Sequence, residues 1–276
     1  MTIEFEEIGE RVYLLRHPAL EVNVTLVVGD GEALLVDTLS NATQAGELAA
    51  AARTITPYPW TLVNTHHHFD HCFGNATLAG EPARPIYAHQ AAAARLRDHP
   101  ELVRQQAYDE MRETEPVLAA ELSRTTILAP SHPVHLESTL DIGGRTVVLR
   151  HLGRGHTDGD LVVHVPDADL LVAGDLVEES GPPSFDDSYP LEWPETVAEL
   201  LRLATRRTMV VPGHGAILGI DGVRAQHEQL ATLAWLIRDG HADGAPAERV
   251  AARAPFTPTV TMPAIRLGYA ELSGDT

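Results

Sequence analysis

Short hydrophobic runs in the first third of the chain, one of which alternates with polar residues, predict β-strands. Val12 to Leu15, Val22 to Val28 and Ala33 to Val36 are such runs, and their aliphatic and β-branched residues are typical of sheets. Gly29-Asp30-Gly31 separates the last two and indicates a hairpin turn. Further apolar runs predict strands at Thr61 to Val63, Ile86 to Ala88, Val134 to Leu136, Thr146 to Leu149, Leu161 to Val165, Leu170 to Ala173 and Met209 to Val211.

Segments with the composition and spacing of helices lie between and after these strands. The first opens at Asn41 and runs to about Arg53, and it is rich in Ala and Leu. The others are Gln90 to Arg95, Glu101 to Leu122, Trp193 to Leu203, Gly222 to Arg238 and Pro246 to Ala252. The tail contains Pro255, Pro258 and Pro263, and it is predicted to be irregular because proline interrupts helices.

Strands and helices alternate in two similar blocks, which favours two packed sheets with helices outside. No linker-like stretch divides the chain. We therefore expect a single domain over residues 1–276, with a helical insertion near 90–124 and further helices at the C-terminal end.

A histidine-rich segment, Thr65 to His71, follows the predicted strand Thr61 to Val63. In an extended chain alternate side chains share a face, so His66, His68 and Asp70 are expected to point the same way. His71 comes as a turn begins and addresses a neighbouring position, whereas His67 is expected to point away. Imidazole and carboxylate groups together suit zinc, with iron and manganese as alternatives.

Three more polar residues come after strands or in glycine-flanked turns downstream. His156 lies between glycine-containing turns, Asp175 ends an apolar run, and His214 follows Pro212-Gly213. A site for two cations ~3.5–4 Å apart needs about three protein ligands per ion and a bridging group. The predicted ligands are His66, His68 and His156 for one ion and Asp70, His71 and His214 for the other, with Asp175 as the bridging carboxylate.

These motifs, in this order, resemble those of the metallo-β-lactamase superfamily of hydrolases, and the resemblance extends over roughly residues 10–220. It implies an α/β fold, an αββα four-layer sandwich of two mixed sheets flanked by helices, with a dinuclear site at one edge between the sheets. It also implies the same grouping of the ligands. Asp37 corresponds to an aspartate that accepts the free N–H of a ligand histidine; a position just before the helix that opens at Asn41 is the alternative explanation for Asp37.

The resemblance implies a hydrolase that uses a metal-bound hydroxide, with Asp70 holding the nucleophile and moving a proton. The expected cofactors are two divalent ions, zinc first. The substrate would be a small molecule with an ester, thioester, lactone or amide-type bond. The alternatives are an oxidoreductase similar to the persulfide dioxygenases, which use one iron, and a non-catalytic metal-binding protein.

Individual residues narrow the choice among branches of the superfamily. Asp175 disfavours a true β-lactamase, because those enzymes usually lack a bridging aspartate at this position. Quorum-signal lactonases have a tyrosine shortly after the bridging residue, whereas here none occurs before Tyr189. The segment His66 to His71 is similar to that of glyoxalase II, so a glutathione thioester remains open. The substrate pocket is expected to draw on the variable segments 90–124 and 178–193.

Composition and charge bear on the expected binding partners and cellular location of the protein. The chain has 20 basic residues, all arginine, against 39 acidic ones, which gives a net charge of −19. This charge disfavours a nucleic acid partner. The single cysteine, Cys72, is expected to be a packing residue and cannot form an internal disulfide. The acidic start, Met1 to Glu7, is unlike a secretory signal, and no apolar run is long enough for a bilayer. We expect a cytoplasmic protein without a membrane partner, whose oligomeric state the sequence leaves open.

Overall fold

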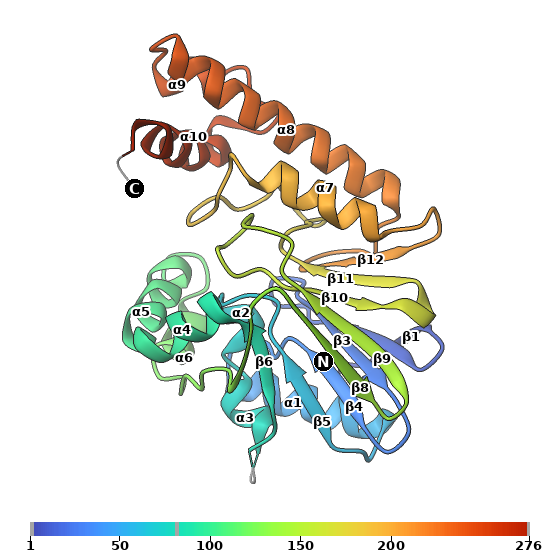
Figure 1. The fold of residues 1–276 in the computed structure, drawn as a ribbon. Helices are drawn as coiled ribbons and strands as arrows, with labels where there is room; N and C mark the ends of the chain where they lie inside the picture. Colours follow the sequence, from blue (N-terminus) through green and yellow to red (C-terminus); the bar gives the residue numbers. More distant parts are fainter. Residues whose placement is uncertain (1–2, 81–82, 275–276) are drawn as a thin grey trace.

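Two mixed β-sheets pack face to face in the computed structural model, which describes residues 3–80 and 83–274 (Figure 1). Met1 and Thr2 of the acidic start lie outside the described residues. The first sheet contains, in pairing order, β1 (Glu6–Gly9), β2 (Val12–Arg16), β3 (Asn23–Val28), β4 (Ala33–Val36), β5 (Trp60–Val63), β6 (Ile86–His89) and β7 (His132–Val134). The second contains β12 (Met209–Pro212), β11 (Leu170–Gly174), β10 (Val162–Val165), β9 (Arg145–Arg150) and β8 (Glu137–Ile142).

Helices cover the outer faces of both sheets and form two further groups. The described helices are α1 (Ala42–Ile55), α2 (Phe69–Cys72), α3 (Asn75–Ala79), α4 (Gln90–Asp98), α5 (Pro100–Met111), α6 (Pro116–Leu122), α7 (Trp193–Leu203), α8 (Ile220–Ala242), α9 (Ala247–Ala251) and α10 (Pro258–Ser273), with a short 3₁₀ turn at Pro166–Ala168. Helices α4, α5 and α6 cluster at one end of the first sheet, and α8, α9 and α10 lie on the side of the second (Figure 1). Within the described ranges, no helix has both the length and the hydropathy that crossing a bilayer requires.

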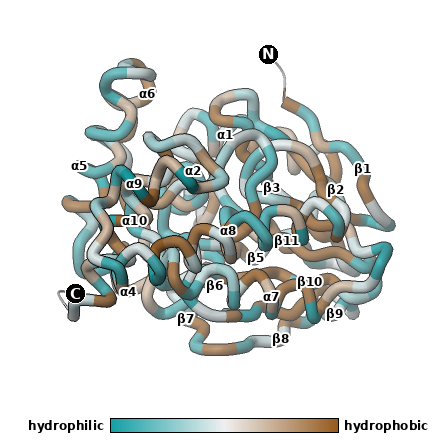
Figure 2. The backbone as a smooth tube through the Cα atoms, turned by 90° about the horizontal axis from the view of Figure 1, so that it is seen from above, coloured by the Kyte–Doolittle hydropathy of each residue, from teal (hydrophilic) through white to brown (hydrophobic). Residues whose placement is uncertain are grey.

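The alternation of side chains along the strands builds the layers. Leu34 and Val36 of β4 lie in the core between the sheets with Val163 of β10, whereas Leu35 lies in the core beneath α1 with Leu48. Successive strand residues point to opposite faces, so a strand that is apolar at every position can serve both cores. Hydrophobic stretches accordingly follow the strands in Figure 2. The predicted sandwich of two mixed sheets with helices outside is confirmed.

The predicted start of the first helix is also confirmed. Asn41 is the N-cap of α1, and its side-chain oxygen accepts a hydrogen bond of 2.9 Å from the amide of Gln44. Such a cap satisfies one of the amides that have no partner within the helix. Because Asn41 fills this position, capping does not explain the presence of Asp37.

The prediction of an irregular tail was wrong, because residues 258–273 form α10. Pro258 occupies the first turn, where the missing N–H has no helical partner to lose. Pro263 lies inside the helix and removes one internal hydrogen bond. Burial of Ala264 and Ile265 in a core shared with α8 offsets this loss. Tertiary packing thus outweighs the local signal from proline.

One boundary in the middle of the chain also differs from prediction. The strand predicted at Val134 to Leu136 falls between two strands, since β7 ends at Val134 and β8 begins at Glu137. β8 alternates exposed polar residues with half-buried ones, so it carries little apolar signal. The helical stretch predicted from Glu101 to Leu122, interpreted as a helix pair or a cap, is the pair α5 and α6, and Pro116 begins the second helix.

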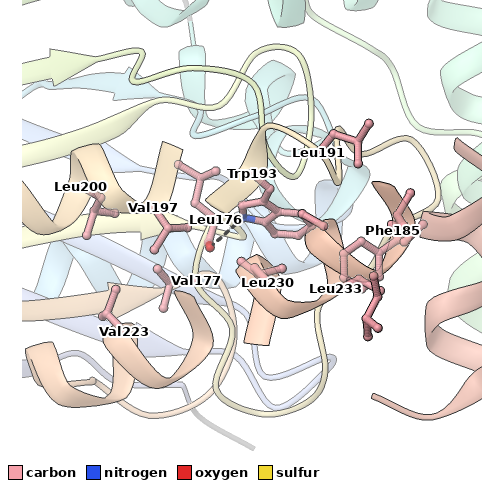
Figure 3. Packing of buried hydrophobic residues seen from close by; sticks show 14 of the residues in the cluster. Leu176, Val177, Phe185, Leu191, Trp193, Val197, Leu200, Val223, Leu230 and Leu233 are labelled. Carbon is pink, nitrogen blue, oxygen red and sulfur yellow. Dashed lines mark hydrogen bonds between the residues drawn. The ribbon is translucent and has the colours of Figure 1, made fainter. Parts of the chain in front are cut away.

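Trp193 lies at the centre of a cluster that we call the C-terminal core, formed by buried residues of β10, β11, β12, α7, α8 and α10 and of the segment before α7 (Figure 3). The indole is fully buried, and its Nε1 donates a hydrogen bond of 3.1 Å to the carbonyl of Leu176. Phe185 packs against it, with ring centroids 5.3 Å apart. These contacts hold the segment between β11 and α7 against the helices.

We expect Trp193→Phe to lower the free energy of unfolding by roughly 1–3 kcal/mol, because the smaller ring leaves a cavity and the carbonyl of Leu176 keeps only its second donor, the side-chain amide of Gln226. Urea unfolding followed by circular dichroism would measure the change. Trp235→Phe is the matched control, since Trp235 is 56% exposed on α8. Equal stability of the two variants would show that the buried hydrogen bond contributes nothing measurable.

Candidate metal centre

Strand ends from both sheets bring the predicted ligands to one edge of the sandwich. Thr65 and His66 follow β5, and α2 then carries Asp70 and His71. In the second sheet, Asp175 directly follows β11, and His214 comes two residues after β12. His156 lies in the loop before β10. All seven predicted ligands therefore converge, although they are spread from residue 66 to residue 214.

The first group consists of three histidines and one carboxylate. The ligand atoms of His66, His68, His156 and Asp175 all lie within 4.8 Å of one another. Nε2 of His156 is 2.8 Å from Nδ1 of His68 and 3.5 Å from Oδ2 of Asp175. Nε2 of His66 is 3.7 Å from the same carboxylate oxygen. This arrangement of nitrogen and oxygen atoms suits a single divalent cation.

The second group consists of Asp70, His71 and His214, again within 4.8 Å of one another. Oδ2 of Asp70 is 3.3 Å from Nε2 of His214 and 3.6 Å from Nε2 of His71. Asp175 contacts this group as well, because its Oδ1 is 3.1 Å from His71 and its Oδ2 is 3.4 Å from His214. One carboxylate thus lies between both groups.

Two buried atoms at the centre have no well-aligned hydrogen bond to any residue that the structure describes. They are Nε2 of His66 and Oδ1 of Asp175, on side chains that are 1% and 7% exposed. Unpaired buried polar atoms are rare in folded proteins, and each requires an explanation. A cation held between the two groups would supply the missing interaction, so the residues present fit a metal.

The pKa values differ among the histidines, and also within the first group, because the burial of His68 is outweighed by the carboxylates around it, Asp187 foremost, which raise its pKa to about 9. Burial lowers the pKa of His66 well below its ordinary value and that of His156 to about 4, so both rings are neutral, as ligands must be. Burial also opposes the charge on His71 and His214, but Asp175 and Asp70 outweigh it. These carboxylates raise the pKa of His71 well above its ordinary value and that of His214 to about 10. Without a cation, protons on these rings balance the carboxylates.

Asp37 orients one histidine of each group. Its Oδ2 accepts hydrogen bonds from Nδ1 of His71, at 2.8 Å, and from the hydroxyl of Thr65, at 2.9 Å. That hydroxyl is 3.0 Å from Nδ1 of His66 and is the acceptor there, because its own proton goes to Asp37. Both rings therefore present Nε2 to the site. The contact that the resemblance implied for Asp37 is present.

The prediction that His66, His68 and Asp70 share one face of an extended segment was wrong. The chain does not stay extended, since α2 begins at Phe69 and His68 is its N-cap. Asp70 reaches the centre from the first turn of this short helix, next to His71. His67 belongs to neither of these two groups; its ring is buried and lies 3.2 Å from Asp187.

Two further acidic residues lie at the site without having been predicted there. Glu178 forms a possible ligand group with Asp175 and His214, and Asp187 forms one with His67 and His68. Both lie in segment 178–193, which the sequence indicated only as a pocket wall. The adjacent acids Asp186 and Asp187 were the one available signal, and acidic pairs are common in surface loops.

A cavity of about 240 Å³ opens onto the two groups. Its apolar wall includes Leu20, Phe69, Met111 and Pro182, and its acidic wall includes Glu110 and Asp186. The helical insertion contributes Glu110 and Met111, and segment 178–193 contributes Pro182 and Asp186. Both segments that were expected to line the pocket therefore do so.

We expect Gly213→Ala to disturb Asp175 directly. A Cβ atom at Gly213 would be 1.7 Å from Oδ1 of Asp175 and 2.8 Å from its Cγ. The carboxylate would have to move, at a cost of about 1–3 kcal/mol in unfolding free energy, and metal binding would weaken. Elemental analysis and urea unfolding would measure both. Gly46→Ala is the control, because nothing lies within 4 Å of its Cβ position; similar metal content in the two variants would contradict the prediction.

Comparisons with known proteins agree with this geometry. A family model described as the metallo-beta-lactamase superfamily matches residues 17–214. The chain is 26% identical to metallo-beta-lactamase type 2 of Bacillus cereus over 159 residues, which are 56% of this chain and 52% of that protein. It is also 26% identical to acyl-coenzyme A thioesterase MBLAC2 of Gallus gallus over 214 residues, 72% of this chain and 74% of that protein.

The chain thus spans about half the length of the first curated relatives that it matches. The crystal structure of DIM-1 metallo-beta-lactamase superposes with a TM-score of 0.66 at 19% identity, covering 84% of this chain and 98% of that one. That of FIM-1 from Pseudomonas aeruginosa gives 0.64 at 18% identity, covering 85% and 97%. These structures share the fold. Together with the match of the family model over most of the chain, they show that this protein belongs to the metallo-beta-lactamase superfamily.

Proposed function

We propose that the protein is a hydrolase that uses two divalent cations, zinc in the first instance, and cleaves an ester or thioester bond of a small molecule. The arrangement of Asp175 carries this proposal. Its carboxylate contacts histidines of both groups, and its buried Oδ1 lies 3.1 Å from His71 without a well-aligned hydrogen bond to any described residue. A shared carboxylate between two histidine-containing groups suits a two-cation hydrolytic site.

The roles of the ligands follow from the grouping. His66, His68 and His156 would hold one cation, Asp70, His71 and His214 the other, and Asp175 would contact both. When bound, such cations lower the pKa of water and polarise a carbonyl group.

Asp70 has a second role in the proposal. Its carboxylate lines the cavity and lies beside His214. From there it can orient the attacking water, accept its proton and return that proton to the leaving group.

The chemistry of the cavity favours an uncharged acyl group. Leu20, Phe69 and Met111 offer apolar contacts, whereas Asp186 would repel a carboxylate or phosphate. Burial raises the pKa of Glu110 to about 7, so this side chain adds only part of a negative charge at neutral pH. Among the described residues that line this cavity, none is arginine. The acyl part of a substrate would therefore enter it, and any phosphorylated carrier would remain outside.

The relatives support the ester or thioester class over a β-lactam. The relative named as an acyl-coenzyme A thioesterase aligns over nearly three quarters of both proteins, whereas those named as metallo-beta-lactamases type 2 align over about half. The separate argument from Asp175 points in the same direction.

Elemental analysis of the protein purified without added metal, with His156→Ala beside it, would test the proposal. About two zinc ions per chain, fewer in the variant, and turnover of neutral acyl thioesters or esters are expected. Lactones and phosphodiesters belong in the same screen. One iron per chain would instead favour the dioxygenase alternative, metal without turnover would favour the non-catalytic one, and no tightly held metal would contradict the mechanism.

A further inference from the structure

Asp187 joins two neighbouring histidines at the rim of the metal centre. Its Oδ1 is 3.1 Å from Nε2 of His68, and its Oδ2 is 3.2 Å from Nε2 of His67. Arg95 lies 3.9 Å from the same carboxylate. The Asp187 carboxylate thus faces a ring nitrogen of both histidines and can accept a hydrogen bond from each.

An acceptor at Nε2 determines which nitrogen of His68 is free. Because Asp187 accepts there, Nε2 carries a proton, and Nδ1 is the nitrogen that a cation could bind in place of a proton. Nδ1 is the atom that faces the first group, 2.8 Å from Nε2 of His156. His68 differs in this from His66 and His71, whose Nδ1 atoms are engaged by Thr65 and Asp37 and whose Nε2 atoms face the site.

We propose that Asp187 is the positioning residue of His68, holding its ring so that Nδ1 is presented to the first cation. The proposal rests on the two-cation hydrolase proposed above. Carboxylate partners of this kind orient ligand histidines and make them more basic, and their loss typically lowers metal affinity by about 10–100-fold.

Contacts made by the residues on either side of Asp187 fix its position. Phe185 is buried in the C-terminal core (Figure 3), and its carbonyl accepts a hydrogen bond of 3.3 Å from the hydroxyl of Ser188. The amide of Tyr189 donates to the carbonyl of Gly155, at 2.8 Å, next to His156. Asp187 is thus fixed between anchors on both sides.

The same segment also forms part of the substrate wall. Ser184 and Asp186 line the cavity on either side of the Phe185 anchor, and Asp187 follows directly. Asp187 therefore couples the wall to the first cation, since a shift of this segment would move both the cavity surface and the partner of His68.

Zinc binding to metal-stripped protein, measured by competition with a chromophoric chelator, tests the role of Asp187. We expect Asp187→Ala to weaken binding of the more affected ion by about 10–100-fold. Asp187→Asn keeps an acceptor for the N–H of His68 and should lose less. Asp186→Ala removes the same charge one residue away, without a histidine contact, and should bind zinc nearly as well as the wild type. Urea unfolding of each metal-stripped variant shows whether it is folded.

Nitrogen-15 NMR of the zinc-loaded protein gives a second readout that a merely structural role would not produce. The wild type should show His68 protonated at Nε2 with metal-bound Nδ1, and in Asp187→Asn the Nε2–H signal should shift towards a weaker hydrogen bond. If Asp187→Ala does not fold, the zinc affinity of Asp187→Asn and the shift of its His68 Nε2–H signal test the role of Asp187 instead. Unchanged affinity and an unchanged signal would overturn the role of Asp187 while wild-type zinc binding upholds the hydrolase proposal; a wild type that binds no zinc would overturn both.

Discussion

Asp175→Ala is expected to lower kcat/KM for the best acyl substrate by roughly a thousandfold or more. Asp175 contacts both groups of ligands, and four histidines lie within 3.7 Å of its oxygens. Its removal takes a ligand from each cation and leaves the imidazoles without a counter-charge. Steady-state kinetics and elemental analysis on the same preparation would show activity and metal content falling together.

Asp175→Asn separates charge from shape in this experiment. The amide has nearly the same volume, but it is a weaker ligand and turns an N–H group towards the histidines, so most of the loss should remain. Asp221→Ala, which removes an almost fully exposed carboxylate on α8, serves as the control. Full metal content with activity within about tenfold of wild type in Asp175→Ala would remove the basis of the two-cation assignment.

Asp37→Ala is expected to have the largest effect on stability, lowering the free energy of unfolding by about 3–5 kcal/mol. The carboxylate is buried and accepts three hydrogen bonds, from the amide and hydroxyl of Thr65 and from Nδ1 of His71. Removing it leaves these donors buried without a partner. Urea unfolding of the metal-stripped protein would measure the loss without a contribution from metal.

The backbone at Asp37 adds a smaller cost to the alanine variant, because its φ of 69° lies in the left-handed region that asparagine tolerates better than alanine. Asp37→Asn therefore tests the charge alone, and it should still be clearly destabilised because its N–H groups face donors. Asp30→Ala is the matched control, since that carboxylate forms an exposed ion pair with Arg11 and should contribute less than about 1 kcal/mol. A loss at Asp37 no larger than at Asp30 would contradict this account.

The ligand residues could be predicted from sequence because each lies beside a strong local signal. His66 to His71 follow an apolar strand directly, and Asp175 and His214 directly follow two others. Asp187 could not be predicted in the same way. Its position depends on Phe185 and Trp193 packing against helices much later in the chain, and no local pattern encodes such a contact.

The fold was predictable to the extent that each element buries an apolar face. β4 and β5 are continuous apolar runs, and α1 has a clear N-cap. β8 was missed because it lies at the edge of its sheet with polar residues exposed. α10 was missed because Pro263 is a strong local signal against a helix, whereas the burial of Ile265 that outweighs it is a long-range effect.

The candidate ligands follow strands of both sheets, so the stability of the protein in a cell would depend on the supply of the cation. Residues 66–71 belong to the first sheet, and Asp175 and His214 to the second, so a cation bound by both would act as a cross-link between the two halves of the sandwich. Mass action then ties folding to the supply of that cation, by about 2.7 kcal/mol when its free concentration is a hundred times the Kd. When the cation is scarce, the two sheets would separate more often near the candidate ligands. Proteases would then degrade the metal-free protein faster than the metal-bound protein.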